Sequence, residues 1–443
     1  MRILSRAQLL VIAVSSLLSA TSPAGVEWHV AAGAAGDGSA NSPFGRIQQA
    51  LERSQPGDTI VVGSGIYHER LTSVKAGTPG APITVRAKTR GSVTVVTTGR
   101  VLTVSHAYHV FDGLVLDGQF GDDDLVRVFR GATAFTIRNS EIRRTSRDAI
   151  DLGAVDDVLI EDVLIHHALN ATNGRKDAHG IAAGAVRRLT IRNSRIHTFS
   201  GDAFQVDPGR AAPGWREVTI EGCRFWLEPL PAAINGFQKG VVPGENAVDT
   251  KANRQFPRAT LSIRNSEAHG FQNGLIGNMA AFNLKEHIDA VVDGVTVWNS
   301  EIAFRLRAPA QVRVQNAVMY DVANGVRYED DIKDLRIWNS TFGTNVGRAF
   351  FSASSRATVL DIRNVLFLGP RVPKIAGANS NLAVAPGAFA DAARHNYDLA
   401  AGSPALDRGA PIADVKTDRM SRRRPQGGGF DVGAYERPVA ARR

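Results

Sequence analysis

One short pattern recurs along most of this chain of 443 residues and limits the folds that the chain can adopt. An Ile is followed by Arg or Trp, then by Asn, and then by Ser or Val. The clearest copies occupy residues 136–140, 190–194, 262–266, 336–340 and 361–365. With weaker copies included, the apolar position recurs at Val110, Ile137, Ile160, Ile191, Ile220, Ile263, Val292, Val314, Ile337 and Ile362. The nine intervals span 252 residues, or 28 on average, which indicates a solenoid or a propeller.

The residues around each copy favour short strands over helices. Apolar and polar residues alternate, as expected for a strand with one buried face, and Gly, Asn and Asp supply corners between strands. A propeller blade needs about 40 residues, more than eight of the nine intervals provide. We therefore expect an all-β chain that forms a right-handed parallel β-helix, a solenoid of about ten coils. An antiparallel β-sandwich with chance repetition is the alternative.

The segments outside the repeats predict how the chain begins and ends. Residues 1–24 contain two early arginines and an apolar run at 9–18, the pattern of a secretory signal peptide; an uncleaved anchor is the alternative. Phe44, Ile47 and Leu51 share one face of a short amphipathic helix that would cap the core. The expected organisation is a signal peptide at 1–24, an N-terminal cap and first coils at 25–100, coils at 101–369 and a closing segment at 370–443.

Charge and cysteine content narrow the expected partners and location. The formal net charge is +9, which favours a polyanionic partner. The basic residues are spread along the chain and no nucleic-acid motif is present, so we expect no nucleic acid partner. No later stretch approaches the ~18 apolar residues of a membrane span. A single cysteine, Cys223, excludes an intramolecular disulfide framework. We expect a secreted or periplasmic monomer that binds an acidic polysaccharide.

A second repeated strand predicts two outward columns of side chains. In each run the third residue is apolar and the fourth and sixth face outward. The first column contains Asp151, Ala182, Gln205, Asp249, Ile276, Arg305 and Arg327, and the second contains Gly153, Gly184, Asp207, Lys251, Asn278, Arg307 and Glu329. Because neighbouring strands lie ~4.8 Å apart, several of these charges would share one patch of about the size of a sugar. The alternative is an ordinary solvated face.

This patch suits cleavage of a uronic acid polymer by β-elimination. That reaction removes the proton beside the carboxylate and expels the neighbouring glycosidic oxygen, so it needs a base and nearby cations. We expect Lys251, one of only nine lysines, to be the base. Arg305 and Arg307 are the expected partners of the substrate carboxylate or the leaving group.

The other polar residues of the patch are assigned to metal and substrate. Asp202, Asp207 and Asp249 are the predicted ligands of a Ca²⁺ ion, which prefers carboxylate oxygens. The predicted substrate-binding residues are His179, Gln205, Asn278 and Arg327. Trp215 and Trp226 are candidates for stacking on sugar rings, with a packing role as the alternative.

Both ends of the chain carry motifs that resemble a known family. Residues 27–69 resemble the N-terminal signature of secreted right-handed β-helix proteins related to polysaccharide lyases. Residues 403–407, 424–427 and 431–436 resemble the element that closes such chains. The resemblance implies the β-helix fold. The family also includes hydrolases, epimerases and noncatalytic surface proteins, so the fold alone does not give the chemistry.

The run around Lys251 resembles the base-bearing strand of β-helix alginate lyases and chondroitinase B, where an Arg on the next coil assists. The pectate lyases, which use a Lys base with clustered Asp around calcium, are an equal comparison. This chain departs from both, because the next predicted coil carries Ile276 and Asn278 and the adjacent Asp pair is absent. Two alternatives remain: a glycoside hydrolase of the polygalacturonase type that uses Asp148, Asp151 and Asp202, or a noncatalytic polyanion-binding module.

Overall fold

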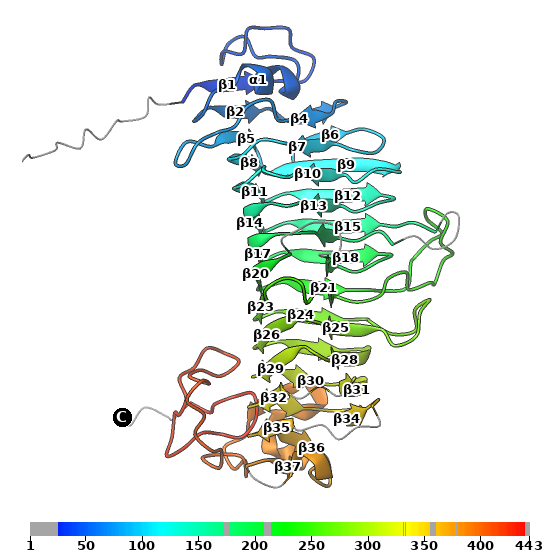
Figure 1. The fold of residues 1–443 in the computed structure, drawn as a ribbon, viewed down its shortest axis with the longest axis vertical. Helices are drawn as coiled ribbons and strands as arrows, with labels where there is room; N and C mark the ends of the chain where they lie inside the picture. The colour runs from blue at the N-terminus through cyan, green and yellow to red at the C-terminus, as the bar shows by residue number, and fades with distance from the viewer. Residues whose placement is uncertain are drawn as a thin grey trace, which may run out of the picture.

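The chain winds into a parallel β-solenoid of about 12 turns, with three sheets that run along an elongated molecule (Figure 1). The computed structural model describes residues 25–171, 177–207, 214–330, 332, 334–354, 360–377 and 380–438. The predicted signal peptide at 1–24 lies outside these residues. Within the described ranges, no helix is long and apolar enough to cross a membrane.

Sheet 1 contains the recurring apolar position. Its strands, in spatial order, are β1 (Glu27–Val30), β2 (Thr59–Val62), β5 (Ile83–Ala87), β8 (His109–Asp112), β11 (Phe135–Arg138), β14 (Asp156–Glu161), β17 (Arg187–Arg192), β20 (Arg216–Glu221), β23 (Ala259–Arg264), β26 (Ile288–Asp293), β29 (Gln311–Gln315), β32 (Asp334–Trp338) and β35 (Leu360–Arg363). Ile137 pairs with Ile160, Ile160 with Ile191, and the series continues to Ile362. These side chains are buried and stack into the core.

The ten predicted repeats correspond one by one to the strands from β8 to β35, but the count of about ten coils is not confirmed. Strands β1, β2 and β5 precede them in sheet 1. At the first counted repeat the predicted phase is wrong by one residue, since Phe111 and not Val110 pairs with Ile137.

The Asn and Ser of the pattern build the corner between sheets 1 and 3. The Asn residues adopt the left-handed conformation, which Asn tolerates better than most residues, with φ of 53° at Asn139, 52° at Asn193, 48° at Asn265, 43° at Asn339 and 56° at Asn364. The Ser140 hydroxyl donates to the Arg138 carbonyl at 2.7 Å and accepts from the Leu114 amide at 3.1 Å. The pattern therefore both bends the chain and joins one coil to the next.

Sheet 2 carries the two outward columns predicted from the sequence. Its strands, in chain order, are β4 (Leu71–Thr72), β7 (Leu102–Val104), β10 (Val126–Val128), β13 (Ile150–Leu152), β16 (Ile181–Ala183), β19 (Phe204–Val206), β22 (Val248–Thr250), β25 (Ala280–Leu284), β28 (Ser300–Arg307), β31 (Val322–Glu329) and β34 (Val346–Ser352). The strand beside β22 is β25, so the predicted strand at 273–278 is wrong. That segment contains Gly274, Gly277 and two Asn with positive φ, which suit a loop.

Sheet 3 carries a stack of aromatic rings on its outward face. Its strands are β3 (Gly65–Tyr67), β6 (Val93–Val96), β9 (Leu114–Gly121), β12 (Glu141–Thr145), β15 (Leu164–Ala168), β18 (Arg195–Phe199), β21 (Arg224–Trp226), β24 (Glu267–His269), β27 (Thr296–Trp298), β30 (Val318–Met319), β33 (Thr341–Phe342), β36 (Leu366–Leu368) and β37 (Leu382–Val384). The aromatic stack, with successive centroids 4.2–6.1 Å apart, consists of His166, His197, Trp226, His269, Trp298, Tyr320 and His395. Trp226 is thus packed between two rings, which leaves little of its face for a sugar.

Short elements occupy the two ends of the solenoid. Helix α1 (Ile47–Arg53) lies at the N-terminal end with Ile47, Ala50 and Leu51 buried; that it seals the core stays a prediction. At the other end are the hairpin of β38 (Phe389–Asp391) and β39 (Asn396–Leu399) and the 3₁₀ turns η2 (Lys374–Ala376), η3 (Pro386–Ala388) and η4 (Ala392–Arg394).

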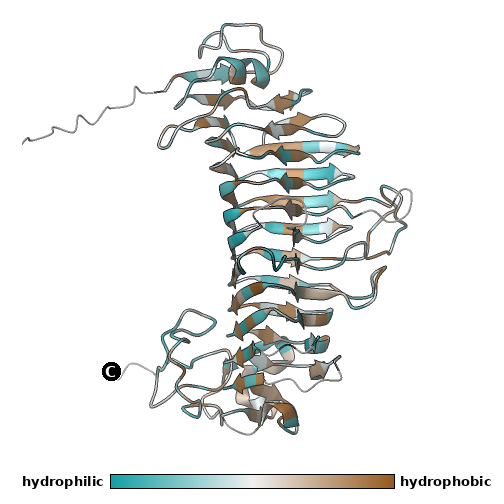
Figure 2. Cartoon of the chain, viewed as in Figure 1, coloured by the Kyte–Doolittle hydropathy of each residue, from teal (hydrophilic) through white to brown (hydrophobic). Residues whose placement is uncertain are grey.

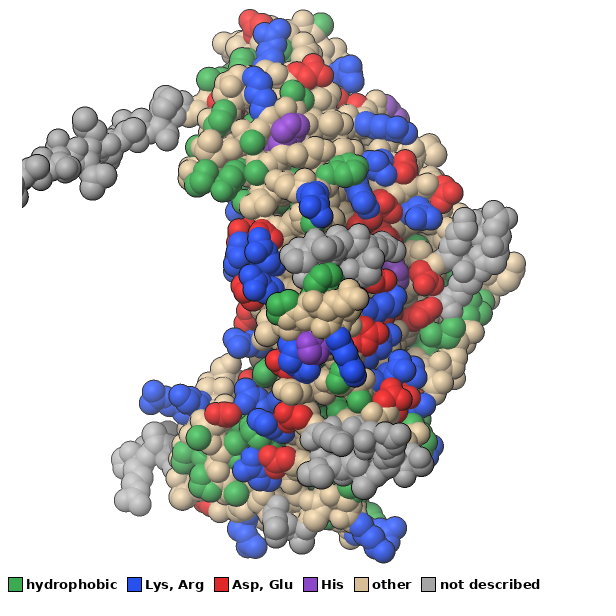
Figure 3. Space-filling model, viewed as in Figure 1, with side chains coloured by type: hydrophobic (Ala, Val, Ile, Leu, Met, Phe, Trp, Pro, Cys, Tyr) green, Lys and Arg blue, Asp and Glu red, His purple; other side chains and the backbone are tan. Residues whose placement is uncertain are grey.

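The last part of the chain returns to sheet 1. Ile412 and Val415 pack on Trp338, and Asp414 accepts a 2.8 Å hydrogen bond from Arg313. Apolar and polar residues alternate along the strands (Figure 2). On the visible surface, basic and acidic side chains are interspersed (Figure 3).

Candidate functional site

The outward face of sheet 2 brings the predicted catalytic lysine beside a second lysine. Strand pairing places Gln205 opposite Asp249, Asp249 opposite Asn283 and Asn283 opposite Arg305. In the neighbouring column, Lys285 follows the end of β25 as Lys251 follows the end of β22. The sequence does not predict Lys285 as a site residue, because it places the strand beside β22 at residues 273–278 and not at β25.

Lys251 is held at its backbone while its amine stays accessible. The Trp215 indole Nε1 donates to the Lys251 carbonyl at 2.8 Å, and Trp215 is buried. The Lys251 Nζ lies 3.2 Å from Gln205 Oε1 and 3.5 Å from Asp207 Oδ2. The Lys251 side chain is 36 % exposed, so an external molecule can reach its amine. Trp215 is therefore part of the core and holds the backbone of Lys251 in place, so it has a packing role.

Lys285 forms the more buried ion pair of the two lysines. Its Nζ lies 2.9 Å from Asp249 Oδ1, and the side chains are 14 % and 5 % exposed respectively. Asn283 Nδ2 donates to the same oxygen at 2.7 Å. Burial and, after it, the Asp202 charge raise the pKa of Asp249, whereas Lys285 and Lys251 lower it, and the net pKa is about 6. Asp249 is thus a carboxyl group of this site whose pKa lies above its ordinary value.

The three predicted calcium ligands all have polar partners. Asp202 accepts from Asn246 Nδ2 at 2.7 Å and from Gln205 Nε2 at 2.8 Å. Asp249 is paired with Lys285, and Asp207 with Lys251. These hydrogen bonds and ion pairs use oxygens that a metal ion would need.

A different set of carboxylates converges near β13, three strands away from β22. Among the described residues, the set with ligand atoms mutually within 4.8 Å is Asp124, Asp148 and Asp151. Arg127 forms ion pairs with Asp124 and with Asp151, so a guanidinium lies in the group. The sequence pattern does not indicate Asp124, because this residue precedes β10, outside the aligned runs.

Small side chains connect this acidic group to the lysines. Strand β16 pairs with both β13 and β19 and places Ala182 and, just beyond its end, Gly184 in the two outward columns. At ~4.8 Å per strand, β13 and β22 are about 14 Å apart. A sugar chain laid along sheet 2 would therefore reach both groups.

The predicted substrate-binding residues have different environments. His179 is buried, and its Nδ1 accepts from the Asp202 amide at 2.8 Å, which joins two coils. Gln205 bridges Asp202 and Lys251. Asn278 lies in the loop before β25 and outside the predicted column, yet it accepts a hydrogen bond from Arg327 Nη1.

The two predicted catalytic arginines each have a carboxylate partner. Arg305 Nε lies 2.6 Å from Glu329 Oε1, and Arg307 Nε lies 3.1 Å from Asp330 Oδ2. Strand pairing places Arg305 opposite Asn283. The two arginines therefore lie on β28, the strand that follows β25 on the sheet 2 face. A substrate carboxylate would have to compete with Glu329 and Asp330 for these guanidinium groups.

Comparison with known proteins identifies the fold. No protein-family model and no curated protein matches the sequence. A solved rhamnogalacturonan lyase matches with a TM-score of 0.50 and 13 % identity, covering 88 % of this chain and 98 % of that chain. Pectate lyase Pel9A matches with a TM-score of 0.49 and 17 % identity, covering 94 % and 97 %. A PL6 family polysaccharide lyase from Pseudopedobacter saltans matches with a TM-score of 0.47 and 13 % identity, covering 87 % and 96 %.

The likeness to the rhamnogalacturonan lyase shows that this chain has a β-helix fold used by polysaccharide lyases. The resemblance inferred from the sequence is confirmed at the level of the fold. At 13 % identity the likeness does not extend to the residues of the site.

Proposed function

We propose that this protein is a polysaccharide lyase that cleaves a uronic acid polymer by β-elimination. The observation that carries the proposal is an accessible lysine, Lys251, beside a buried lysine and carboxylate pair on the outward face of sheet 2. β-Elimination needs a base and cationic groups at the substrate carboxylate, and this face supplies both. The shared fold with a rhamnogalacturonan lyase is consistent with this chemistry.

In this proposal Lys251 removes the proton from the ring carbon next to the carboxylate. The electron pair of that bond forms a carbon–carbon double bond, and the bond to the glycosidic oxygen on the next carbon breaks. The leaving oxygen takes up a proton, so the products are an unsaturated uronate end and a new hydroxyl. Arg305 and Arg307 bind the carboxylate or the leaving oxygen after exchanging their own carboxylate partners.

Calcium is part of the proposal, with a revised set of ligands. Asp124, Asp148 and Asp151 supply converging hard oxygen ligands, which Ca²⁺ prefers. Arg127 competes for the same oxygens and has to move aside for the ion to bind. A bound Ca²⁺ would neutralise a second carboxylate of the polymer. Asp202, Asp207 and Asp249 are less suited, because they are not among the described carboxylates whose oxygens converge, and Asn, Gln and Lys donors engage them as Arg127 engages Asp124 and Asp151.

Export and a monomeric state belong to the same proposal. An enzyme for an external polysaccharide has to leave the cytoplasm, and the signal-like segment at 1–24 supports such export. The net charge of +9 favours approach to an anionic polymer.

The test is incubation with pectate, alginate, hyaluronan and chondroitin, each with and without calcium. The expected result is ultraviolet absorbance from an unsaturated uronate with at least one polymer. Lys251→Ala should abolish it, whereas Lys88→Ala serves as the matched control, because Lys88 is exposed and follows β5 of sheet 1, away from the sheet 2 face. New reducing ends without absorbance would instead favour hydrolysis by Asp148 and Asp151. Binding without any product would favour the noncatalytic alternative.

A further inference from the structure

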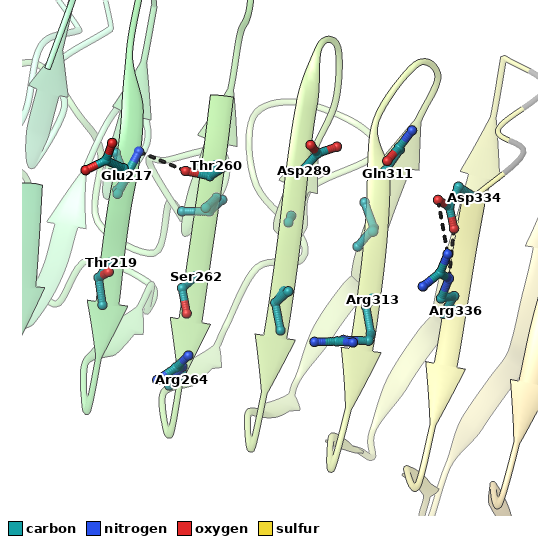
Figure 4. A pocket seen from close by; sticks show the side chains of 15 residues that line it. Glu217, Thr219, Thr260, Ser262, Arg264, Asp289, Gln311, Arg313, Asp334 and Arg336 are labelled. Carbon is teal, nitrogen blue, oxygen red and sulfur yellow. Dashed lines mark hydrogen bonds and ion pairs between the residues drawn. The ribbon is translucent and has the colours of Figure 1, made fainter. Parts of the chain in front are cut away.

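A second concave surface lies on sheet 1, away from the lysines of sheet 2. It spans β20, β23, β26, β29 and β32 and encloses about 580 Å³ (Figure 4). We call it the sheet 1 trough and define it by the outward central column Thr219, Ser262, Val291, Arg313 and Arg336.

The shape of the trough follows from side-chain size along this column. Thr219, Ser262 and Val291 are small and pair directly across neighbouring strands, so they form a low floor. Arg313 and Arg336 continue the column and close the trough at its C-terminal end. Five strands at ~4.8 Å spacing extend over about 19 Å, and this spacing is close to the length that one sugar adds to a chain.

The floor contains polar atoms that lack a partner within the described part of the chain. Ser262 Oγ and Arg313 Nε are buried and form no hydrogen bond. Arg313 is fixed in place, because its Nη1 donates to Asp414 at 2.8 Å and its guanidinium lies 5.5 Å from the Trp338 ring. Buried polar groups are usually hydrogen-bonded, so a ligand that shifts the side chains covering these two atoms would gain a hydrogen bond at each.

The charges around the trough favour an anion at the arginine end. Two of the flanking carboxylates are already neutralised by close arginines: Asp289 by Arg258 at 2.7 Å, and Asp334 by Arg336 at 3.0 Å. Arg264, at the edge of the trough, adds a further positive charge. A carboxylate placed on Arg313 Nε would meet a guanidinium that Asp414 already holds through Nη1.

We propose that the sheet 1 trough is a second, noncatalytic binding site for an extended oligosaccharide of uronic acids, about four sugars long at the strand spacing. A sugar carboxylate accepts from Arg313 Nε, and sugar hydroxyls pair with Ser262 and Thr219. The choice of a uronic acid rests on the proposed function, whereas the site itself is independent of Lys251. Such a site would keep the polymer on the protein between cleavage events.

The test is calorimetric titration of the full chain with acidic tetrasaccharides, namely tetragalacturonate and tetramannuronate, and with neutral cellotetraose. Lys251→Ala is used as the background to prevent cleavage. We expect two sites per chain for at least one acidic tetramer. Ser262→Trp fills the trough and should remove one site, whereas Thr136→Trp, at the same column position on β11 outside the trough, should remove none.

Two smaller substitutions separate loss of binding from loss of folding. Ser262→Ala and Arg313→Gln, with unchanged circular dichroism and thermal unfolding, should each weaken the trough site at least tenfold. If all three trough variants keep both sites, the proposal is overturned. Equal binding of cellotetraose would overturn the carboxylate assignment. A single site that Ser262→Trp removes would retain the trough and instead count against the sheet 2 site of the proposed function.

Discussion

Lys285 Nζ lies 2.9 Å from Asp249 Oδ1, and this buried pair joins β25 to β22, the strand that Lys251 follows. Lys285 therefore compensates the buried charge of Asp249 and contributes to the stability of the fold. Lys285→Met should leave the Asp249 carboxylate buried with only an amide donor. Because an uncompensated buried charge is costly, we expect a loss of about 3 kcal/mol in the free energy of unfolding at pH 8, measured by urea denaturation.

A matched double variant isolates this pair. Asp249→Asn in the Lys285→Met background removes the unpaired charge and should restore most of the lost stability. Equal stability of Lys285→Met and the unsubstituted protein would show that the ion pair does not form.

Asp249 should also give a characteristic dependence of stability on pH. Burial and the Asp202 charge raise its pKa to about 6, above the value of about 3.9 in an unfolded chain. The folded state therefore binds more protons than the unfolded state between pH 4 and 6, and this contribution to stability is lost as the pH rises through 6. Asp249→Asn should remove that decrease. Identical pH profiles for the two proteins would contradict the assignment.

The histidines of the aromatic stack on sheet 3 should make the protein less stable as the pH falls, the opposite of the effect of Asp249. Burial lowers the pKa of His197 to about 3, with help from the charges of His166 and His167, and burial lowers that of His269 to about 4. An unfolded histidine titrates near 6.5, so the stabilisation is complete above that pH and is lost as the pH falls towards 3 to 4.

Phenylalanine substitution tests this effect without removing the ring. His197 stacks on Trp226 at 4.2 Å, and His197→Phe keeps a flat ring in the same place. The thermal unfolding midpoint of His197→Phe should fall less than that of the unsubstituted protein between pH 6.5 and 4. A parallel decrease in both proteins would show that His197 does not titrate as proposed.

The sequence predicted the fold better than the site, for a physical reason. Stacked core positions repeat in every coil, so the series from Ile137 to Ile362 could be aligned by its recurring short pattern although the intervals vary. Outward columns depend on where each strand begins. The loop between β24 and β25 contains Asn-Gly and Gly-Asn steps that resemble a coil corner, so the sequence aligns Ile276 and Asn278 where the structure has Asn283 and Lys285.

The charge pairs could not be predicted from the sequence at all. Arg305 pairs with Glu329, and Arg127 with Asp124 and Asp151, because long side chains bend toward partners on neighbouring strands. A strand pattern gives the position of each Cα but not the rotamer of a side chain. The hydrogen bonds that the side-chain amides of Asn246 and Gln205 donate to Asp202, one of the predicted calcium ligands, could not be predicted for the same reason.

We propose that Lys251 is the base, and the most direct test is the turnover of Lys251→Arg on whichever polymer the native protein cleaves. Arginine keeps the positive charge but stays protonated, so it cannot accept the substrate proton. Lys251→Arg and Lys251→Ala should both lose at least ~100-fold in the rate of unsaturated product formation, the usual scale for removal of a general base. Turnover of Lys251→Arg equal to that of the native protein would contradict the assignment.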